Sequence, residues 1–180
     1  MVSNLERPEM SVTPDLLTEH LLDAAQRAGA DAADAMAIAG QSLAIDVRAG
    51  QLEQAERAEG VDIGLRVLVG QRQASVSASD ISASTITALA ERAVAMAREA
   101  PEDPYIGLAS DDLLAKDWDI AALDLCEDAP EPEPAALQEA AQAAEAAAQA
   151  VAGVTQVQSA SAIYDRRQIA LATSAGFAGG

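Results

Sequence analysis

The stretch "VDIGLRVLVGQRQASVSASD", residues 61–80, decides the fold of this chain. From Val61 to Val69 every second residue is apolar, and this period of two predicts a β-strand with one buried face. Gly70 then interrupts the alternation, which resumes in "RQASVSASD", residues 72–80. A glycine between two alternating segments is typical of a hairpin turn, so we expect two antiparallel strands here.

The residues before this hairpin predict further strands. "SLAIDVRAG" (42–50) and "QLEQAERAEG" (51–60) each end in a glycine. Glycine punctuates strand segments because it adopts turn conformations at no steric cost. We therefore expect an antiparallel meander of short strands, with turns at Gly50, Gly60 and Gly70.

Three segments predict helices. Residues 13–28 begin with Thr13 as a plausible N-cap, residues 82–100 stop before Pro101, and residues 134–152 are rich in alanine. Hydroxyl N-caps, prolines at helix boundaries and alanine all favour helix formation at these places. The second helix carries an apolar stripe that we expect to face the core, formed by Ile86, Leu89, Ala93 and Met96.

The third helix and the residues after it repeat the pattern of the first helix and its strands. "SASAIYDRRQIALATS" (159–174) alternates on both sides of a polar centre, which predicts a hairpin with its turn at residues 165–167. The first copy continues into the meander, whereas the second stops just after Gly176. We therefore expect two helix-plus-strands repeats, the second of them incomplete.

The fold predicted from these patterns is α+β, with antiparallel sheet(s) of short strands packed with about three helices. Residues 1–12 are expected to be a flexible N-terminus, 13–108 a first helix, meander and helix unit, and 134–180 a second helix-plus-hairpin unit. Between them, residues 109–133 are acidic and rich in proline and predict a surface connector. We expect it to be held to the body by Tyr105, Ile106, Trp118 and Leu125.

Composition excludes several classes of function. The formal net charge of −18 would repel phosphate backbones and anionic membranes, so we expect no direct nucleic-acid binding. No apolar segment approaches the ~20 residues that span a bilayer, and the first residues lack the features of a signal peptide. The single cysteine, Cys126, excludes an internal disulfide and suits a reducing compartment. These features predict a protein of the cytoplasm.

No catalytic or metal-binding residue is predicted. His20 is the only histidine and lacks metal-ligand partners at helical spacing, which leaves neither a metallopeptidase site nor a Ser-His-Asp triad. Cys126 stands beside Glu127 and Asp128, which disfavour its thiolate. The chain has no Gly-rich phosphate loop. The spacing of an EF-hand calcium loop is also absent from the acidic residues Asp111, Asp112, Asp117, Asp119 and Asp124.

Ser75, Ser77 and Ser79 are the candidate binding residues. They are two positions apart and therefore share one face of the predicted strand. One interpretation is an ordinary polar sheet face, and the other is a surface on which a peptide strand lies.

The chain also resembles a known family. "AGADAADA" (28–35), the segment 47–82 and "APEDPYIGLAS" (100–110) stand in the order and spacing of the N-terminal region of the TldD/PmbA family, also labelled modulators of DNA gyrase. The PmbA (TldE) branch is the more similar one. Its motifs are the Gly60-x-x-x-Gly64 strand, the Ala-Ser-x-Ser strand around Ser75 and Ser77, and the D-P-x-x-G step at Asp103, Pro104 and Gly107.

This resemblance implies a subunit of a two-subunit metal-dependent peptidase that cleaves unfolded peptides. In that family zinc or a similar divalent metal is bound by an H-E-x-x-x-H helix of TldD, in a region that follows the one covered here. The motif does not occur in this chain, so no catalytic residue is carried over. Two explanations stay open, a TldE-type subunit that never had the motif or an N-terminal portion of a TldD-type subunit. The expected partners are a TldD-like subunit, a second copy of the chain, or both.

A second hypothesis is a stand-alone protein-interaction module without enzymatic activity, which would work through an exposed sheet edge. Family members are much longer, so we expect the chain to be an N-terminal portion. The gyrase label fits poorly with the net charge of −18, because an effect on gyrase would then have to pass through a protein partner or a cleaved peptide.

Overall fold

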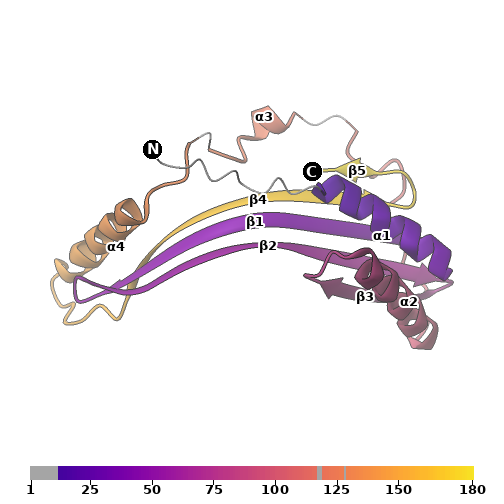
Figure 1. The fold of residues 1–180 in the computed structure, drawn as a ribbon, viewed down its shortest axis with the longest axis horizontal. Helices are drawn as coiled ribbons and strands as arrows, with labels where there is room; N and C mark the ends of the chain where they lie inside the picture. The colour runs from indigo at the N-terminus through magenta and orange to yellow at the C-terminus, as the bar shows by residue number, and fades with distance from the viewer. Residues whose placement is uncertain (1–11, 117–118, 128) are drawn as a thin grey trace, which may run out of the picture. The chain divides into compact units, whose positions relative to one another are not determined.

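The computed structural model describes residues 12–116, 119–127 and 129–180. The fold is α+β, with one antiparallel five-stranded sheet in the order β3-β2-β1-β4-β5 (Figure 1). This confirms the predicted fold class. The elements are α1 (Pro14–Ala28), β1 (Ala32–Arg48), β2 (Gln51–Val69), β3 (Arg72–Ala78), α2 (Ala83–Glu99), α3 (Ile120–Leu123), α4 (Pro134–Gln149), β4 (Ala160–Thr173) and β5 (Ala178–Gly179).

The three predicted helices are present as α1, α2 and α4. The Thr13 hydroxyl accepts a hydrogen bond from the Leu16 amide at the start of α1, and Gly29 ends that helix with a φ of 94°. The Ser82 hydroxyl accepts from the Thr85 amide at the start of α2. These caps satisfy amides that have no partner within the helix, which is why the helices begin where the sequence places them.

The strands are longer than predicted, and the turn expected at Gly60 is wrong. β2 runs through Gly60, and β1 and β2 are joined by a turn at Ala49 and Gly50, both with positive φ. Two consecutive residues with positive φ match the twist of a tight hairpin. Gly60 has no positive φ, because its neighbours continue to pair along β1, the adjacent strand in the sheet order.

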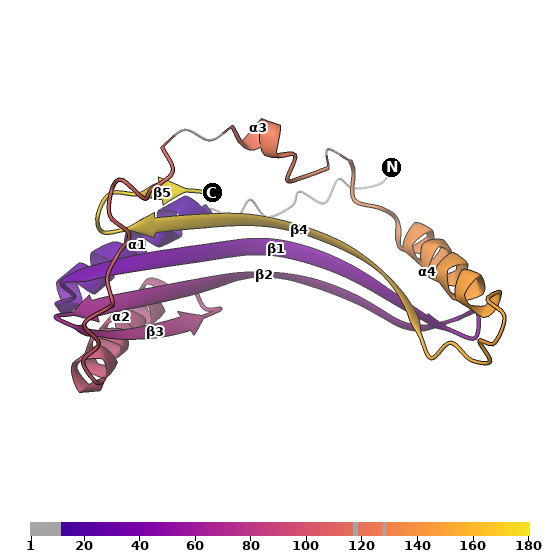
Figure 2. The ribbon, with the colours of Figure 1, turned by 180° about the vertical axis from the view of Figure 1, so that it is seen from behind.

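The predicted turn at residues 165–167 is also wrong, because these residues lie inside β4. Arg167 and Asp165 are two apart on one face and form an ion pair, with Nε 2.8 Å from Oδ1. β4 is the neighbour of β1, and the two strands lie side by side in both views (Figure 2). Gly40 of β1 lies against Arg167, since an added Cβ there would be 3.1 Å from Arg167 Cγ. A continuous neighbouring strand therefore outweighs the polar composition of this stretch.

The structure forms two compact units, each built from interleaved segments. The first contains the described residues up to 38 together with 61–114 and 168–180, and the second contains 39–60 and 115–167. The sequence suggested consecutive units instead. The segments interleave because β1, β2 and β4 each contribute residues to both units.

The core of the first unit lies between α1, α2 and one face of the sheet (Figure 1). Leu17 and Leu21 of α1, Leu89 of α2 and Val67 of β2 are among its buried side chains. The predicted stripe of α2 is buried except at its end, because Met96 is 47% exposed. Met96 thus lies at the margin of the buried face of α2, which continues at Ala97.

The second unit has a small apolar cluster of Ile45, Val47 and Ala141. Glu145 of α4 is buried beside it, with 3% of its surface exposed. Its two carboxylate oxygens accept hydrogen bonds from the amides of Ala49 and Gly50, each 2.7 Å long. A buried carboxylate is stable only when its oxygens are satisfied in this way.

The acidic connector is held differently from the prediction. Tyr105 and Leu125 are 95% and 73% exposed, so neither holds it to the body, and Trp118 lies outside the described residues. Within the second unit, the Glu131 carboxylate accepts hydrogen bonds from Gln41 and Arg57. Polar contacts therefore hold the connector there.

Helices long and apolar enough to cross a membrane are absent from the described part of the chain.

Candidate functional site

The candidate site lies on β3, the last strand at its side of the sheet. β3 pairs with β2 in an unbroken antiparallel register, in which Ser75 is opposite Arg66 and Ser77 is opposite Gly64. Ala74, Val76 and Ala78 pack against the core, which leaves Ser75, Ser77 and Ser79 exposed on the other face. The structure thus brings the three serines onto one exposed face. Their role in binding a peptide stays a prediction.

The three serines differ in their hydrogen bonds. Ser79 Oγ donates to Asp62 Oδ1 of β2 at 2.5 Å, so this hydroxyl is already engaged. The side chains of Ser75 and Ser77 make no hydrogen bond to any residue that the structure describes. Ser75 and Ser77 are therefore the hydroxyls that remain available to a ligand.

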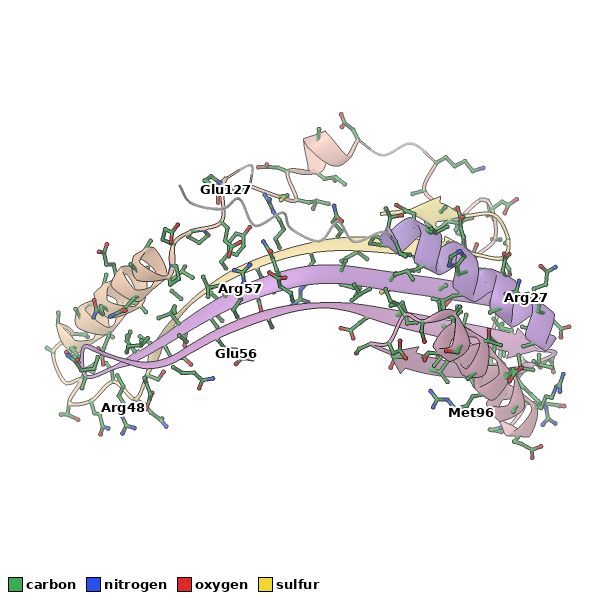
Figure 3. The ribbon with its side chains drawn as sticks, in the orientation of Figure 1. Arg27, Arg48, Glu56, Arg57, Met96 and Glu127 are labelled. Carbon is green, nitrogen blue, oxygen red and sulfur yellow. The ribbon has the colours of Figure 1, made fainter. Side chains whose placement is uncertain are left out.

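An open groove runs beside these serines, between the outer edge of β3 and helix α2. We call it the β3 groove; it has a volume of about 510 Å³ and is lined by Ser75, Val76, Ser77, Arg92 and Met96. Arg92 and Met96 are four residues apart on α2, so they lie on the same face of the helix. Figure 3 shows Met96 on α2.

Arg92 is exposed and forms no ion pair with the described residues. Elsewhere in the first unit, Arg66 donates from Nε to Asp34 Oδ2 at 2.8 Å, and Arg72 lies 3.3 Å from Glu102. Arg66, which is opposite Ser75 in the register, is therefore paired with an acidic side chain, whereas Arg92 in the groove is not paired with any described one.

The start of α2 fixes the helix that carries Arg92 and Met96. Asp80 accepts hydrogen bonds from the Thr85 hydroxyl and from the Ser82 amide, at 2.5 and 2.9 Å. The hydrogen bond from Thr85, followed by those from Ser82, lowers the pKa of Asp80 below its ordinary value. This network anchors α2 next to the end of β3.

The charged side chains of the second unit serve a different purpose. Arg57 of β2 donates to Glu131 and to Glu59, and Figure 3 labels it. The hydrogen bond to Glu131, and then the one to Glu59, raises the pKa of Arg57 above its ordinary value. These contacts tie the connector to the hairpin formed by β1 and β2.

The donor set does not fit a zinc site. His20 is exposed on α1 and Cys126 is exposed in the connector. Across residues 12–116, 119–127 and 129–180, no three His, Cys, Asp or Glu side chains come together to hold a metal ion. Even a catalytic zinc site, which keeps one position open, needs about three His, Cys, Asp or Glu ligands around the ion, and the described residues do not form such a group.

The fold, and the stretch of sequence that carries this candidate site, match the first domain of a class of metallopeptidases. Residues 33–97 match the family described as PmbA/TldA metallopeptidase domain 1. The match extends from the start of β1 to the end of α2, and so it includes every residue that lines the β3 groove.

Individual relatives agree with this assignment. A curated relative from Haemophilus influenzae, named metalloprotease PmbA homolog, is 33% identical over 96 residues, covering 53% of this chain and 21% of that protein. TldE from Thermococcus kodakarensis has a similar fold, with a TM-score of 0.68 at 14% identity over 91% of this chain and 36% of that one. A Bacteroides thetaiotaomicron structure named for modulation of DNA gyrase gives a TM-score of 0.65 at 18% identity, over 91% and 37%.

These similarities support an N-terminal portion of a TldD/PmbA-family protein. The chain spans about a fifth of the length of the curated relative and a little over a third of the two solved chains.

Arg92 was not predicted as a site residue, although the sequence around it indicates that it has no ion-pair partner on its own helix. The positions three and four residues before and after Arg92 hold Leu89, Ala88, Ala95 and Met96. A helical arginine without an acidic neighbour at these spacings has no ion-pair partner on its own helix.

Proposed function

We propose that the chain is the N-terminal, non-catalytic domain of a TldE/PmbA-like subunit. In this proposal the subunit joins a TldD-like chain in a heteromeric metallopeptidase of the cytoplasm that processes unstructured peptides. The observation that carries the proposal is the match of residues 33–97 to the first domain of PmbA/TldA metallopeptidases. The 33% identity over 96 residues to a relative named metalloprotease PmbA homolog supports the choice of branch.

The sequence supports a non-catalytic role for this domain. It has one histidine, whereas metallopeptidase motifs that activate water on a helix use two histidines and a carboxylate. Zinc or a similar divalent metal is therefore expected on the TldD-like partner. The contribution of this chain is to present an exposed, hydroxyl-lined strand to a flexible peptide.

Co-expression with a TldD-type subunit tests this proposal. We expect the two chains to elute together in size-exclusion chromatography and to digest a flexible, unfolded substrate such as casein. The digestion should stop with a chelator and return with zinc, and neither chain alone should be active. A co-eluting pair that leaves casein intact with zinc present, or two chains that do not associate, would contradict the proposal.

The alternative function is a stand-alone interaction module, which the exposed edge of β3 favours. It predicts that the chain binds an extended peptide with full affinity when no second subunit is present. A full loss of digestion together with normal peptide binding by the isolated chain would favour this alternative.

A further inference from the structure

Beyond Arg72 at its start, the outer edge of β3 lacks the charges, prolines and bulges that usually protect an edge strand. Residues 73–78 read "QASVSA", without a charged residue or a proline, and the register with β2 continues without a bulge. Within the described part of the chain, no strand pairs with the other side of β3. Such an edge offers free amide and carbonyl groups to an added strand.

Arg92 supplies a charge preference at this edge. The chain has 29 acidic and 11 basic residues, and Arg92 is the arginine that lines the groove without an ion pair to the described residues. Its guanidinium has planar donors that match a carboxylate in a two-pronged geometry. An acidic side chain on a bound peptide would form the ion pair that no described residue of this chain forms with Arg92.

Met96 supplies an apolar contact beside the charge. Its side chain is 47% exposed in the groove, and a thioether adapts to apolar groups of varied shape. Arg92 and Met96 are one helical turn apart, about 6 Å along the axis. Side chains two positions apart in an extended peptide are separated by about 6.7 Å, so one peptide face can meet both residues.

We propose that the β3 groove binds an extended peptide as an added strand, with an acidic side chain on Arg92 and an apolar side chain two positions away on Met96. This inference rests on the proposed function, since it specifies which flexible peptides the domain prefers. Ser75 and Ser77 provide hydroxyls beside the peptide backbone.

Fluorescence anisotropy with the 180-residue chain tests the proposal directly. Two short flexible peptides are compared, one carrying Asp-Thr-Leu and the other Lys-Thr-Leu at its centre. We expect the acidic peptide to bind about tenfold more tightly, as for one charge-assisted hydrogen-bonded pair. Arg92→Glu should reverse this preference, and Met96→Ala should weaken both peptides several-fold.

Arg27→Glu is the matched control. Arg27 is exposed on α1 and does not line the groove, yet its replacement changes the net charge by the same amount. The preference should survive in Arg27→Glu, and circular dichroism should show both variants folded. A preference that Arg92→Glu leaves unchanged, or that Arg27→Glu abolishes equally, would overturn the proposal.

Hydrogen exchange separates strand addition from a purely electrostatic contact. The acidic peptide should slow amide exchange within residues 73–78, because those amides become hydrogen-bonded. Unchanged exchange there in the saturated complex would contradict binding at the edge.

Failure of this inference is distinguishable from failure of the proposed function. If Arg92→Glu does not alter peptide preference but the paired subunits still digest casein, only the groove assignment is wrong. If the groove binds the acidic peptide as expected but the pair is inactive, the groove assignment stands and the peptidase proposal fails.

Discussion

The two compact units are stabilised by different means. The first unit packs α1 and α2 on one sheet face through buried aliphatic side chains such as Leu17, Leu21 and Val67. In the second unit, a small cluster of Ile45, Val47 and Ala141 is supplemented by the buried carboxylate of Glu145. The first unit therefore depends on apolar area, whereas the second depends on directional hydrogen bonds.

This difference explains which unit suits binding. A closely packed core holds β3 and α2 in fixed positions, so that the backbone on both sides of the β3 groove is preorganised. In the second unit, residues 51–60 of β2 are exposed throughout, and Gln142 Nε2 donates to the Gly50 carbonyl at 2.8 Å. The turn there is held at its end by α4.

Leu21→Ala should have the largest effect on stability. Leu21 is fully buried in the first unit, and truncation of a buried leucine leaves a cavity that costs about 3 kcal/mol. Urea unfolding measures the loss. Leu16→Ala on the same helix is the control, because Leu16 is 37% exposed and should lose well under half as much. Equal losses for the two variants would contradict the assigned core.

Glu145→Ala should have the second-largest effect on stability. Its loss removes both hydrogen bonds to the Ala49 and Gly50 amides, and a buried polar contact of this kind is worth about 1–3 kcal/mol. Urea unfolding and amide exchange at residues 49 and 50 report the effect. Glu139→Ala, an exposed change on α4, should leave both measurements unaltered. Unchanged exchange at the turn in Glu145→Ala would show that the carboxylate does not hold it.

Gly50→Ala should destabilise the chain less than Leu21→Ala or Glu145→Ala. Gly50 has a φ of 73°, a conformation that costs an alanine about 1 kcal/mol. Gly60→Ala is the matched comparison, since Gly60 is extended and an added Cβ there meets nothing within 4 Å. Thermal unfolding should separate the two variants, with Gly60→Ala neutral or stabilising. Equal losses would mean that β2 also turns at Gly60.

Gly50 and Gly60 show which features of the fold could be predicted from the sequence and which could not. The alternation from Val61 to Val69 and the caps of the helices report local conformation, so the α+β class and three helices followed from them. Gly50 and Gly60 look alike in sequence, and only the pairing of β2 along β1 distinguishes a turn from a strand interior. The turn predicted at the polar residues 165–167 was wrong for the same reason, because strand pairing is a tertiary effect.

The groove was predictable only in part. The serines share a face by simple alternation, so Ser75, Ser77 and Ser79 could be named in advance. Arg92 and Met96 come from a helix that follows β3, and their position beside its edge depends on how α2 packs. Met96 was assigned to the core stripe by its spacing, but it is 47% exposed and lies beside the buried face of α2.

Asp80→Asn should give the smallest effect and sharpen the comparison with Glu145. Both carboxylates accept hydrogen bonds, but Asp80 is exposed, where water competes for the same bonds. The pKa of Asp80 is lowered in the folded chain, chiefly by the Thr85 hydroxyl and then by Ser82. Its stabilisation is therefore fully present above the ordinary carboxyl pKa of about 3.9 and is lost as the pH falls through the lower folded value.

Urea unfolding at about pH 6 and below about pH 3 tests this sign. The wild-type chain should be slightly more stable than Asp80→Asn at the higher pH, and the difference should shrink at the lower one. Thr85→Val should remove most of the same pH dependence, because it deletes the main donor to Asp80. A difference that grows on acidification would mean that the ionised form of Asp80 is not the one that the folded chain stabilises.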